Sequence, residues 1–224
     1  KPGQKATNFK IMGYTHYYYT PEVMDKKRFT DLATDVRKIF EFSEDKLGIK
    51  LANGLGDNDT RPEVTNDVIR FNGSEGQPTG VWTTNERISI PWPSNDAGLN
   101  EPNPDPIADK TDGTWFSGSI LTQRVAPINN DTGKGSGSYE TLCIDRDNSK
   151  AEFKQFNRNE LLFNFCKTAY RPYDLVVTAV LIALKHHFQE ARISSDGESS
   201  EWMDGMMLCN NILGYGMEFE LDRD

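Results

Sequence analysis

One stretch of the chain, residues 175–184, constrains the fold more than any other part of the sequence. Nine of its ten residues are apolar, and Thr178 is the exception. The stretch is about half as long as a helix that crosses a bilayer. Pro172 stands just before it, and proline favours the first turn of a helix. A helix that is apolar on nearly every side must be buried among other elements. The sequence therefore predicts a buried central helix over 172–188.

The segments on either side of this helix predict an α+β fold. Apolar residues recur at spacings of three, four and seven along 21–46, which is typical of an amphipathic helix, and a third helix is predicted over 200–213. Runs of β-branched and aromatic residues predict strands at 9–19, 49–52, 68–72, 140–145, 161–168, 192–195 and 217–221. Several of these strands follow one another without a helix between them. This order favours a mixed or largely antiparallel sheet over a doubly wound fold.

Residues 72–138 differ in composition from the rest of the chain. They hold 7 of the 11 prolines, 9 of the 18 glycines and 3 of the 4 tryptophans, and only 16 of these 67 residues are apolar. We interpret them as a long insertion, part loop and part β-rich, within a single domain that spans 1–224. So few apolar residues cannot form a core of their own. Tryptophan is enriched in binding hot spots, so Trp82, Trp92 and Trp115 are predicted interface residues.

Charge and cysteine content limit the partners and the compartment. The chain has 25 basic and 34 acidic residues, a net charge of −9. Nucleic acids and anionic membranes attract basic surfaces, so neither is an expected partner. The three cysteines have no metal-type spacing, and no phosphate-binding glycine loop is present, so no metal and no cofactor are expected. The odd cysteine count favours the cytoplasm, or a virion if the chain is phage-encoded. A secreted chain that has lost a signal peptide is the alternative.

The first candidate site is His16, in the predicted strand 9–19. An imidazole titrates near neutral pH, so His16 could serve as a general acid or base. Side chains alternate along a strand, which puts His16 on the same face as Tyr14 and Tyr18. The alternative is a structural histidine, hydrogen-bonded to neighbouring tyrosines in a semi-polar core.

The second candidate site lies where strand 161–168 ends and the central helix begins. A helix N-terminus offers unpaired N–H groups and a partial positive charge, to which Lys167 and Arg171 add two full charges. Because the helix dipole repels cations there, an anionic ligand would explain both residues. The alternative is local: Asp174 satisfies the dipole and pairs with Arg171, and Lys167 is solvated.

Other polar motifs are interpreted as structural. The Ser-Ser-Asp-Gly segment at 194–197 is typical of an Asx turn. The adjacent His186 and His187 point about 100° apart on a helix, so they cannot both bind one metal ion. They suit the negative end of the central helix instead. Cys166 and Cys209 are predicted to be buried core thiols.

Several of these segments together resemble an uncharacterised protein family of bacteria, phages and filamentous fungi. The resemblance covers most of the chain outside the insertion and rests on residues 13–17, 69–73, 165–174, 175–187 and 194–197. It implies no activity. It groups His16 with Lys167, Arg171, Asn72 and Asp196, of which Asp196 would have an orienting role. The family has a histidine where this chain has the tyrosine at position 139.

Two functions fit these observations. The first is a non-enzymatic binding or structural module, whose tryptophan-rich insertion contacts a protein partner or another copy of the chain. The second is a small hydrolase-like or lyase-like enzyme that acts on a small anionic ligand, with His16 as general acid or base and Lys167 and Arg171 as anion-binding residues. The sequence contains no complete catalytic motif, which favours the first function. Convergence of these side chains in space would favour the second.

Overall fold

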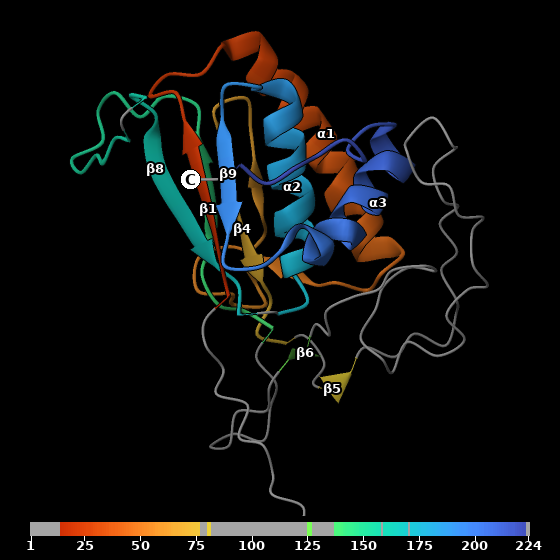
Figure 1. Cartoon of the computed structure of the whole chain (residues 1–224). Helices are drawn as coiled ribbons and strands as arrows, with labels where there is room; N and C mark the ends of the chain where they lie inside the picture. The colour runs from red at the N-terminus through yellow and green to blue at the C-terminus, as the bar shows by residue number, and fades with distance from the viewer. Residues whose placement is uncertain are drawn as a thin grey trace, which may run out of the picture.

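The computed structural model describes residues 14–76, 80–81, 125–126, 137–157, 159–169 and 171–222. Its helices are α1 (Lys26–Asp45), α2 (Asp174–His187) and α3 (Met203–Leu213), and a short 3-10 helix, η3 (Ser199–Trp202), precedes α3. Its strands are β1 (Thr15–Thr20), β2 (Leu51–Ala52), β3 (Glu63–Val64), β4 (Val68–Gly73), β5 (Gly80–Val81), β6 (Val125–Ala126), β7 (Leu142–Asp145), β8 (Leu162–Lys167) and β9 (Arg192–Ser195). Apart from β5 and β6, the strands form one layer, and the helices cover one face of it (Figure 1).

All the strand pairs that the structure describes are antiparallel. β1 is the central strand of a sheet ordered β8-β1-β9, and β4 is the centre of a second sheet that contains β2, β3 and β7. The segment before β7 links the two sheets, because the N–H of Glu140 donates to the carbonyl of Lys167 at 3.2 Å. The predicted α+β fold with a largely antiparallel sheet is therefore confirmed.

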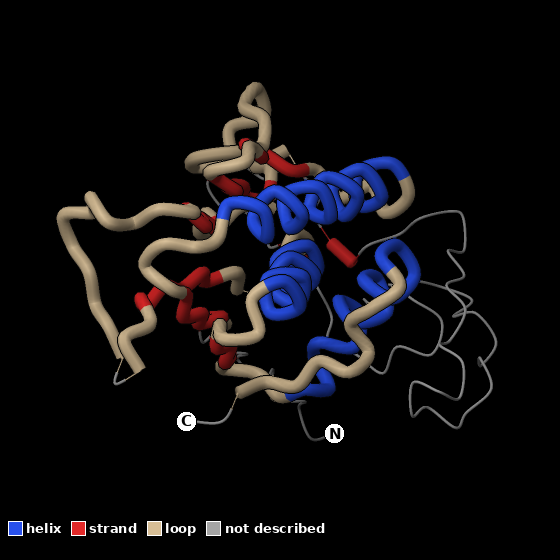
Figure 2. The backbone as a smooth tube through the Cα atoms, turned by 90° about the horizontal axis from the view of Figure 1, so that it is seen from above, coloured by secondary structure: helices blue, strands red, loops and turns tan. Residues whose placement is uncertain are grey.

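α2 is the central helix of the molecule. It lies between α1 and α3 (Figure 2), and the sheet covers a further side of it. The residues of α2 from Asp174 to Leu184 are all buried. The predicted burial of this helix is confirmed, and its lack of a polar face follows from these neighbours. Among the described residues, no helix has both the length and the hydropathy to span a bilayer.

The predicted start of the first helix and the predicted last strand are wrong. The first helix begins at Lys26 rather than near Pro21, because the carboxylate of Asp25 caps it by accepting the N–H of Arg28 at 2.9 Å. Residues 217–221 are not a strand. Asp222 satisfies the edge of β9 instead: its N–H donates to the carbonyl of Ile193, and its carboxylate accepts the N–H of Ile193, both at 2.8 Å.

Of the predicted insertion, the structure describes the two ends and a short stem. The stem is the β5–β6 pair, in which Val81 lies opposite Val125. This pairing brings the two ends of segment 82–124 together. Trp82, Trp92 and Trp115 lie outside the described residues, so their role at an interface stays a prediction.

Candidate functional site

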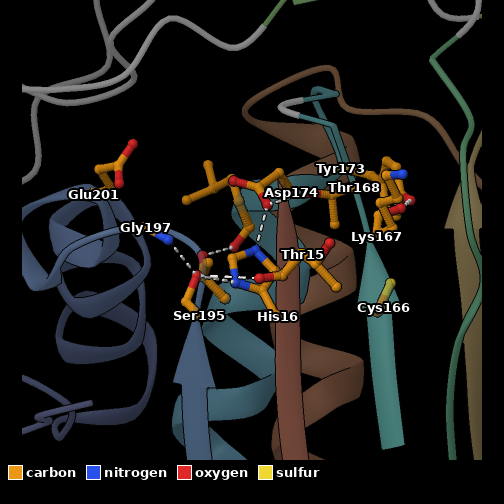
Figure 3. Close-up of polar contacts among 12 residues, drawn as sticks. Thr15, His16, Cys166, Lys167, Thr168, Tyr173, Asp174, Ser195, Gly197 and Glu201 are labelled. Carbon is orange, nitrogen blue, oxygen red and sulfur yellow. Dashed lines mark hydrogen bonds and ion pairs between the residues drawn. The ribbon is translucent and has the colours of Figure 1, made fainter. Parts of the chain in front are cut away.

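Three segments that are distant in sequence meet at one edge of the sheet, around His16. In the antiparallel register, His16 on β1 lies directly opposite Ser195 on β9 and Cys166 on β8. The first residue of α2, Asp174, reaches the same place from the helix layer (Figure 3). Strand pairing and the start of the helix therefore fix the positions of these side chains.

The imidazole of His16 forms a hydrogen bond at each ring nitrogen. Its Nε2 lies 2.7 Å from Oδ1 of Asp174, and its Nδ1 lies 3.0 Å from Oγ of Ser195. A carboxylate only accepts hydrogen bonds, so we assign the proton to Nε2, which donates to Asp174. In the neutral ring, Nδ1 then accepts the hydroxyl proton of Ser195. An acid, a base and a hydroxyl follow one another as in a serine–histidine–aspartate triad, but with the two ring nitrogens exchanged, since the usual triad has Nδ1 on the acid and Nε2 on the serine.

The His16–Asp174 pair is enclosed by protein. The two side chains are 0% and 1% exposed, so their hydrogen bond forms where the dielectric is low and polar interactions are stronger. The hydroxyl of Thr168 donates a further hydrogen bond to Oδ1 of Asp174 at 2.6 Å. The rings of Tyr14 and Trp202 lie edge-on to the imidazole, with centroids 4.8 Å and 4.9 Å away. These contacts fix the orientation of His16 before any ligand binds.

Ser195 differs from the other two members because it is partly exposed. Its Oγ accepts the N–H of Gly197 at 3.1 Å, and its single proton can go either to the Thr15 carbonyl at 3.4 Å or to Nδ1 of His16 at the shorter distance of 3.0 Å. A hydroxyl that contacts a histidine on one side and solvent on the other can meet a substrate while it loses its proton. Ser195 is therefore the member of this series that solvent reaches.

The two predicted anion-binding residues lie together at the same edge, on the β8 side. Nζ of Lys167 is 5.7 Å and Cζ of Arg171 is 5.6 Å from the centre of the Tyr139 ring. Burial lowers the pKa of the Arg171 guanidinium. Its Nε and Nη1 atoms are buried, and none of the described residues accepts a hydrogen bond from either atom. Both cations thus lie near the Tyr139 ring, and their role in binding an anion stays a prediction.

Asn72 and Asp196 contact neither Lys167 nor Arg171 in the hydrogen bonds described, and each bonds a different part of the fold. The buried amide of Asn72 donates to the Tyr139 carbonyl at 3.1 Å and accepts the Tyr139 N–H at 3.1 Å. Asn72 therefore positions Tyr139. Asp196 accepts the N–H of Thr15 at 3.0 Å and the hydroxyl of Tyr17 at 2.9 Å, so both of its oxygens are bonded to β1.

His16 is predicted from the sequence, but its two partners are not. Asp174 looks like a helix-capping acid in the sequence, and Ser195 looks like a turn residue. One signal was available for Asp174: it begins a run of buried residues, and a buried carboxylate needs a partner. Ser195 carries no local signal, because 179 positions separate it from His16.

The opposite end of α2 is occupied by ion pairs. Lys185 lies 3.0 Å from the carboxylate of Asp222, and Nε2 of His187 lies 2.9 Å from that of Asp35. Basic residues are favourable at this negative end of the helix. A cavity of about 560 Å³ opens beside it, lined by residues of α2 and of the segment 216–222. The length of α2, at ~1.5 Å per residue, puts this end about 20 Å from Asp174.

The buried cysteines are poor nucleophiles. Burial, together with the nearby carboxylates of Glu140 and Asp174, raises the pKa of the Cys166 thiol well above its usual range. Burial also raises the pKa of Cys209. Thiols of this kind stay protonated at neutral pH, as expected for core residues. Within the described part of the chain, no three His, Cys, Asp or Glu side chains gather closely enough to hold a metal ion.

Comparison of the chain with known protein families, curated proteins and solved structures found no match. The resemblance to an uncharacterised family therefore stays a prediction. The function has to be inferred from the geometry of the site.

Proposed function

We propose that the protein is a hydrolase with a serine nucleophile. The observation that carries this proposal is the continuous hydrogen-bonded series from Ser195 through His16 to Asp174. In the proposed reaction, Oγ of Ser195 attacks an acyl carbon while its proton passes to Nδ1 of His16. The imidazolium is stabilised by Asp174 and then protonates the leaving group. Water, activated by the same histidine, releases the acid and restores the serine.

The surroundings of Asp174 support this role. The carboxylate lies in the first turn of α2, where the helix dipole favours a negative charge. The Thr168 hydroxyl bonds the same oxygen that accepts the imidazole proton. Asp174 is thus held in place as the hydrogen-bond acceptor of the imidazole.

The developing oxyanion needs a hydrogen-bond donor, and the backbone after Ser195 has none to spare. The N–H of Asp196 donates to the carbonyl of Thr15, and the N–H of Gly197 donates to Ser195 itself. The indole Nε1 of Trp202 is buried, and none of the described residues accepts its proton. Because Trp202 is 0% exposed, its N–H is not open to a substrate, and an oxyanion donor has to come from the substrate's approach to this edge.

The same hydrogen bonds also connect β1, β9 and α2, so a purely structural role is the competing explanation. The two roles differ in chemical reactivity. An activated serine reacts with a fluorophosphonate probe, whereas a structural serine does not. Intact-mass and peptide mass spectrometry should find one adduct, on Ser195, that is lost in Ser195→Ala and in His16→Asn. The matched control is Ser194→Ala, because Ser194 is the preceding residue of β9 and faces the other side of the sheet. Absence of the adduct from the wild type would overturn the proposal.

A binding module is the second candidate function, and one described surface favours it. Tyr17 and Tyr19 of β1 share a sheet face with Phe163 and Phe165 of β8. Phe163 stacks on both Tyr17 and Phe165, at 6.3 Å and 5.9 Å between ring centres, and Phe165 is 51% exposed. Exposed aromatic groups of this kind are typical of contact surfaces. If this face and the tryptophan-rich insertion bind a protein partner or another copy, Phe165→Gln should weaken the association in sedimentation experiments.

A further inference from the structure

Lys167 and Arg171 form a pair of cations around one aromatic ring. The ring belongs to Tyr139, which is 43% exposed, so solvent reaches the space around it. Asn72 and the link between the two sheets hold the Tyr139 backbone in place. The ring and both cations are therefore positioned by the fold before a ligand arrives.

The pair lacks an anionic partner within the described part of the chain. None of the residues there forms an ion pair with either cation, and Nε and Nη1 of Arg171 are buried without an acceptor. The carboxylate of Glu140 lies close by, but it accepts the backbone N–H of Lys167 at 2.8 Å. A buried guanidinium donor without an acceptor is costly, because it has lost water and gained nothing in return.

We infer that Lys167, Arg171 and Tyr139 bind the oxyanion of the substrate, a carboxylate or a phosphate. This inference rests on the proposed function, since it names the charge class of the molecule that Ser195 attacks. Lys167 lies opposite Thr15 on β1, and Ser195 lies opposite His16 on the other side of the same strand. Two strand spacings, roughly 10 Å, separate the backbones of Lys167 and Ser195 at this edge, where the Lys167 side chain leaves the sheet on the face opposite to Ser195. A small ester with its anionic group a few bonds from the acyl carbon would span that distance.

Direct binding tests the anion site without any catalysis. Sodium phosphate and sodium glutarate are titrated at constant ionic strength, and Kd is measured by calorimetry on the full chain. Arg171→Gln and Lys167→Gln should each weaken binding about tenfold or more, as expected for loss of a charge-assisted hydrogen bond. The control is Lys27→Gln, because the Lys27 side chain is 85% exposed and the next residue, Arg28, bonds the carbonyl of His187 at the far end of α2. The two salts separate phosphate from carboxylate recognition. No binding to the wild type, or equal binding to all variants, would overturn the inference.

A stability measurement tests whether the Arg171 guanidinium has a hydrogen-bond acceptor inside the folded chain. Without added anion, Arg171→Met removes the unpaired buried donors, so its Tm should equal or exceed that of the wild type. A lower Tm in anion-free buffer would show that the guanidinium is satisfied inside the chain, which also overturns the inference.

Hydrolysis then separates this inference from the proposed function. Two nitrophenyl esters with acyl chains of equal length are compared, one ending in a carboxylate and one in a methyl group. Arg171→Gln should lower the ratio of kcat/KM for the carboxylate ester to kcat/KM for the neutral ester at least fivefold. Hydrolysis without this preference contradicts the anion site and leaves the nucleophile in place. Anion binding without hydrolysis contradicts the nucleophile and leaves the anion site in place.

Discussion

Asp174 combines a structural and a chemical task, and one isosteric substitution addresses both. In Asp174→Asn the acceptor weakens and the ring of His16 loses the partner that sets its tautomer. A hydrogen bond to a buried polar group is worth about 1–3 kcal/mol, so the free energy of unfolding should fall by that amount. Urea unfolding measures this change, and the fluorophosphonate adduct should be lost even where the variant is folded.

A surface carboxylate gives the comparison for that prediction. Asp31 pairs with Lys27 one helical turn away, and its side chain is 48% exposed. Asp31→Asn should cost under about 1 kcal/mol, because exposed ion pairs contribute little. Equal effects of the two substitutions would mean that the Asp174 network adds nothing beyond a surface contact.

A second residue links the helices and should make stability depend on acid. Burial alone would raise the pKa of Asp35, but hydrogen bonds from His187, Lys38 and Tyr215 outweigh it and the pKa is lowered. A carboxyl with a lowered folded pKa stabilises the protein above its unfolded pKa, and this contribution is lost as the pH falls through the folded pKa. The stability advantage of the wild type over Asp35→Asn should therefore be largest near neutral pH and shrink below about pH 4. Unfolding curves along a pH series check this, and a constant advantage would contradict it.

α2 is the element on which the layered packing depends. Leu181 is fully buried in the middle of this helix. Leu181→Ala should lower the free energy of unfolding by roughly 2–5 kcal/mol, since it removes buried methylene groups and leaves a cavity. The matched control is Leu55→Ala, because Leu55 is 81% exposed and should change stability by less than about 0.5 kcal/mol. A cost below that limit at Leu181 would contradict the central position of α2.

Elements were predictable from the sequence where the signal is local. The apolar run 175–184 has no polar face, and it is buried in the structure. The alternating pattern of 217–221 also looks local, yet it predicts a strand that does not form. The edge that this strand would have covered is satisfied by Asp222, through its carboxylate and its own N–H. A single side chain that satisfies a strand edge produces no alternating pattern, so it cannot be predicted from the periodicity of the sequence.

The candidate site was predictable only in part, for a related reason. His16, Lys167 and Arg171 stand out because of their residue types and positions beside predicted elements. The contacts of His16 with Asp174 and Ser195 bridge 158 and 179 positions of sequence. The register of β1 against β9 decides which serine meets the histidine, and a shift of one residue would present Ser194 instead. Which serine lies opposite His16 therefore depends on how the strands pair, and no single segment of the sequence determines it.

Across the whole molecule, the triad and the aromatic group lie on opposite faces of the sheet. His16 and Ser195 face the helices at the edge where β1 begins and β9 ends. Tyr17, Tyr19, Phe163 and Phe165 face away from the helices, and Lys167 at the end of β8 shares their face. A partner bound to the aromatic face would therefore leave Ser195 uncovered but would come close to Lys167.

The tryptophan-rich insertion can be removed at a defined point, which tests its role directly. Val81 and Val125 are opposite each other in the β5–β6 pair, so an Asn-Gly turn can replace residues 82–124 and close the hairpin. If Trp82, Trp92 and Trp115 contact a partner or another copy, the shortened chain should keep its Tm and lose association in sedimentation velocity. Replacing the three tryptophans with alanine in the full-length chain should have the same effect, because large aromatic side chains dominate binding energy. If instead both variants lose stability while association is unchanged, the rings pack within the chain and the contact hypothesis is contradicted.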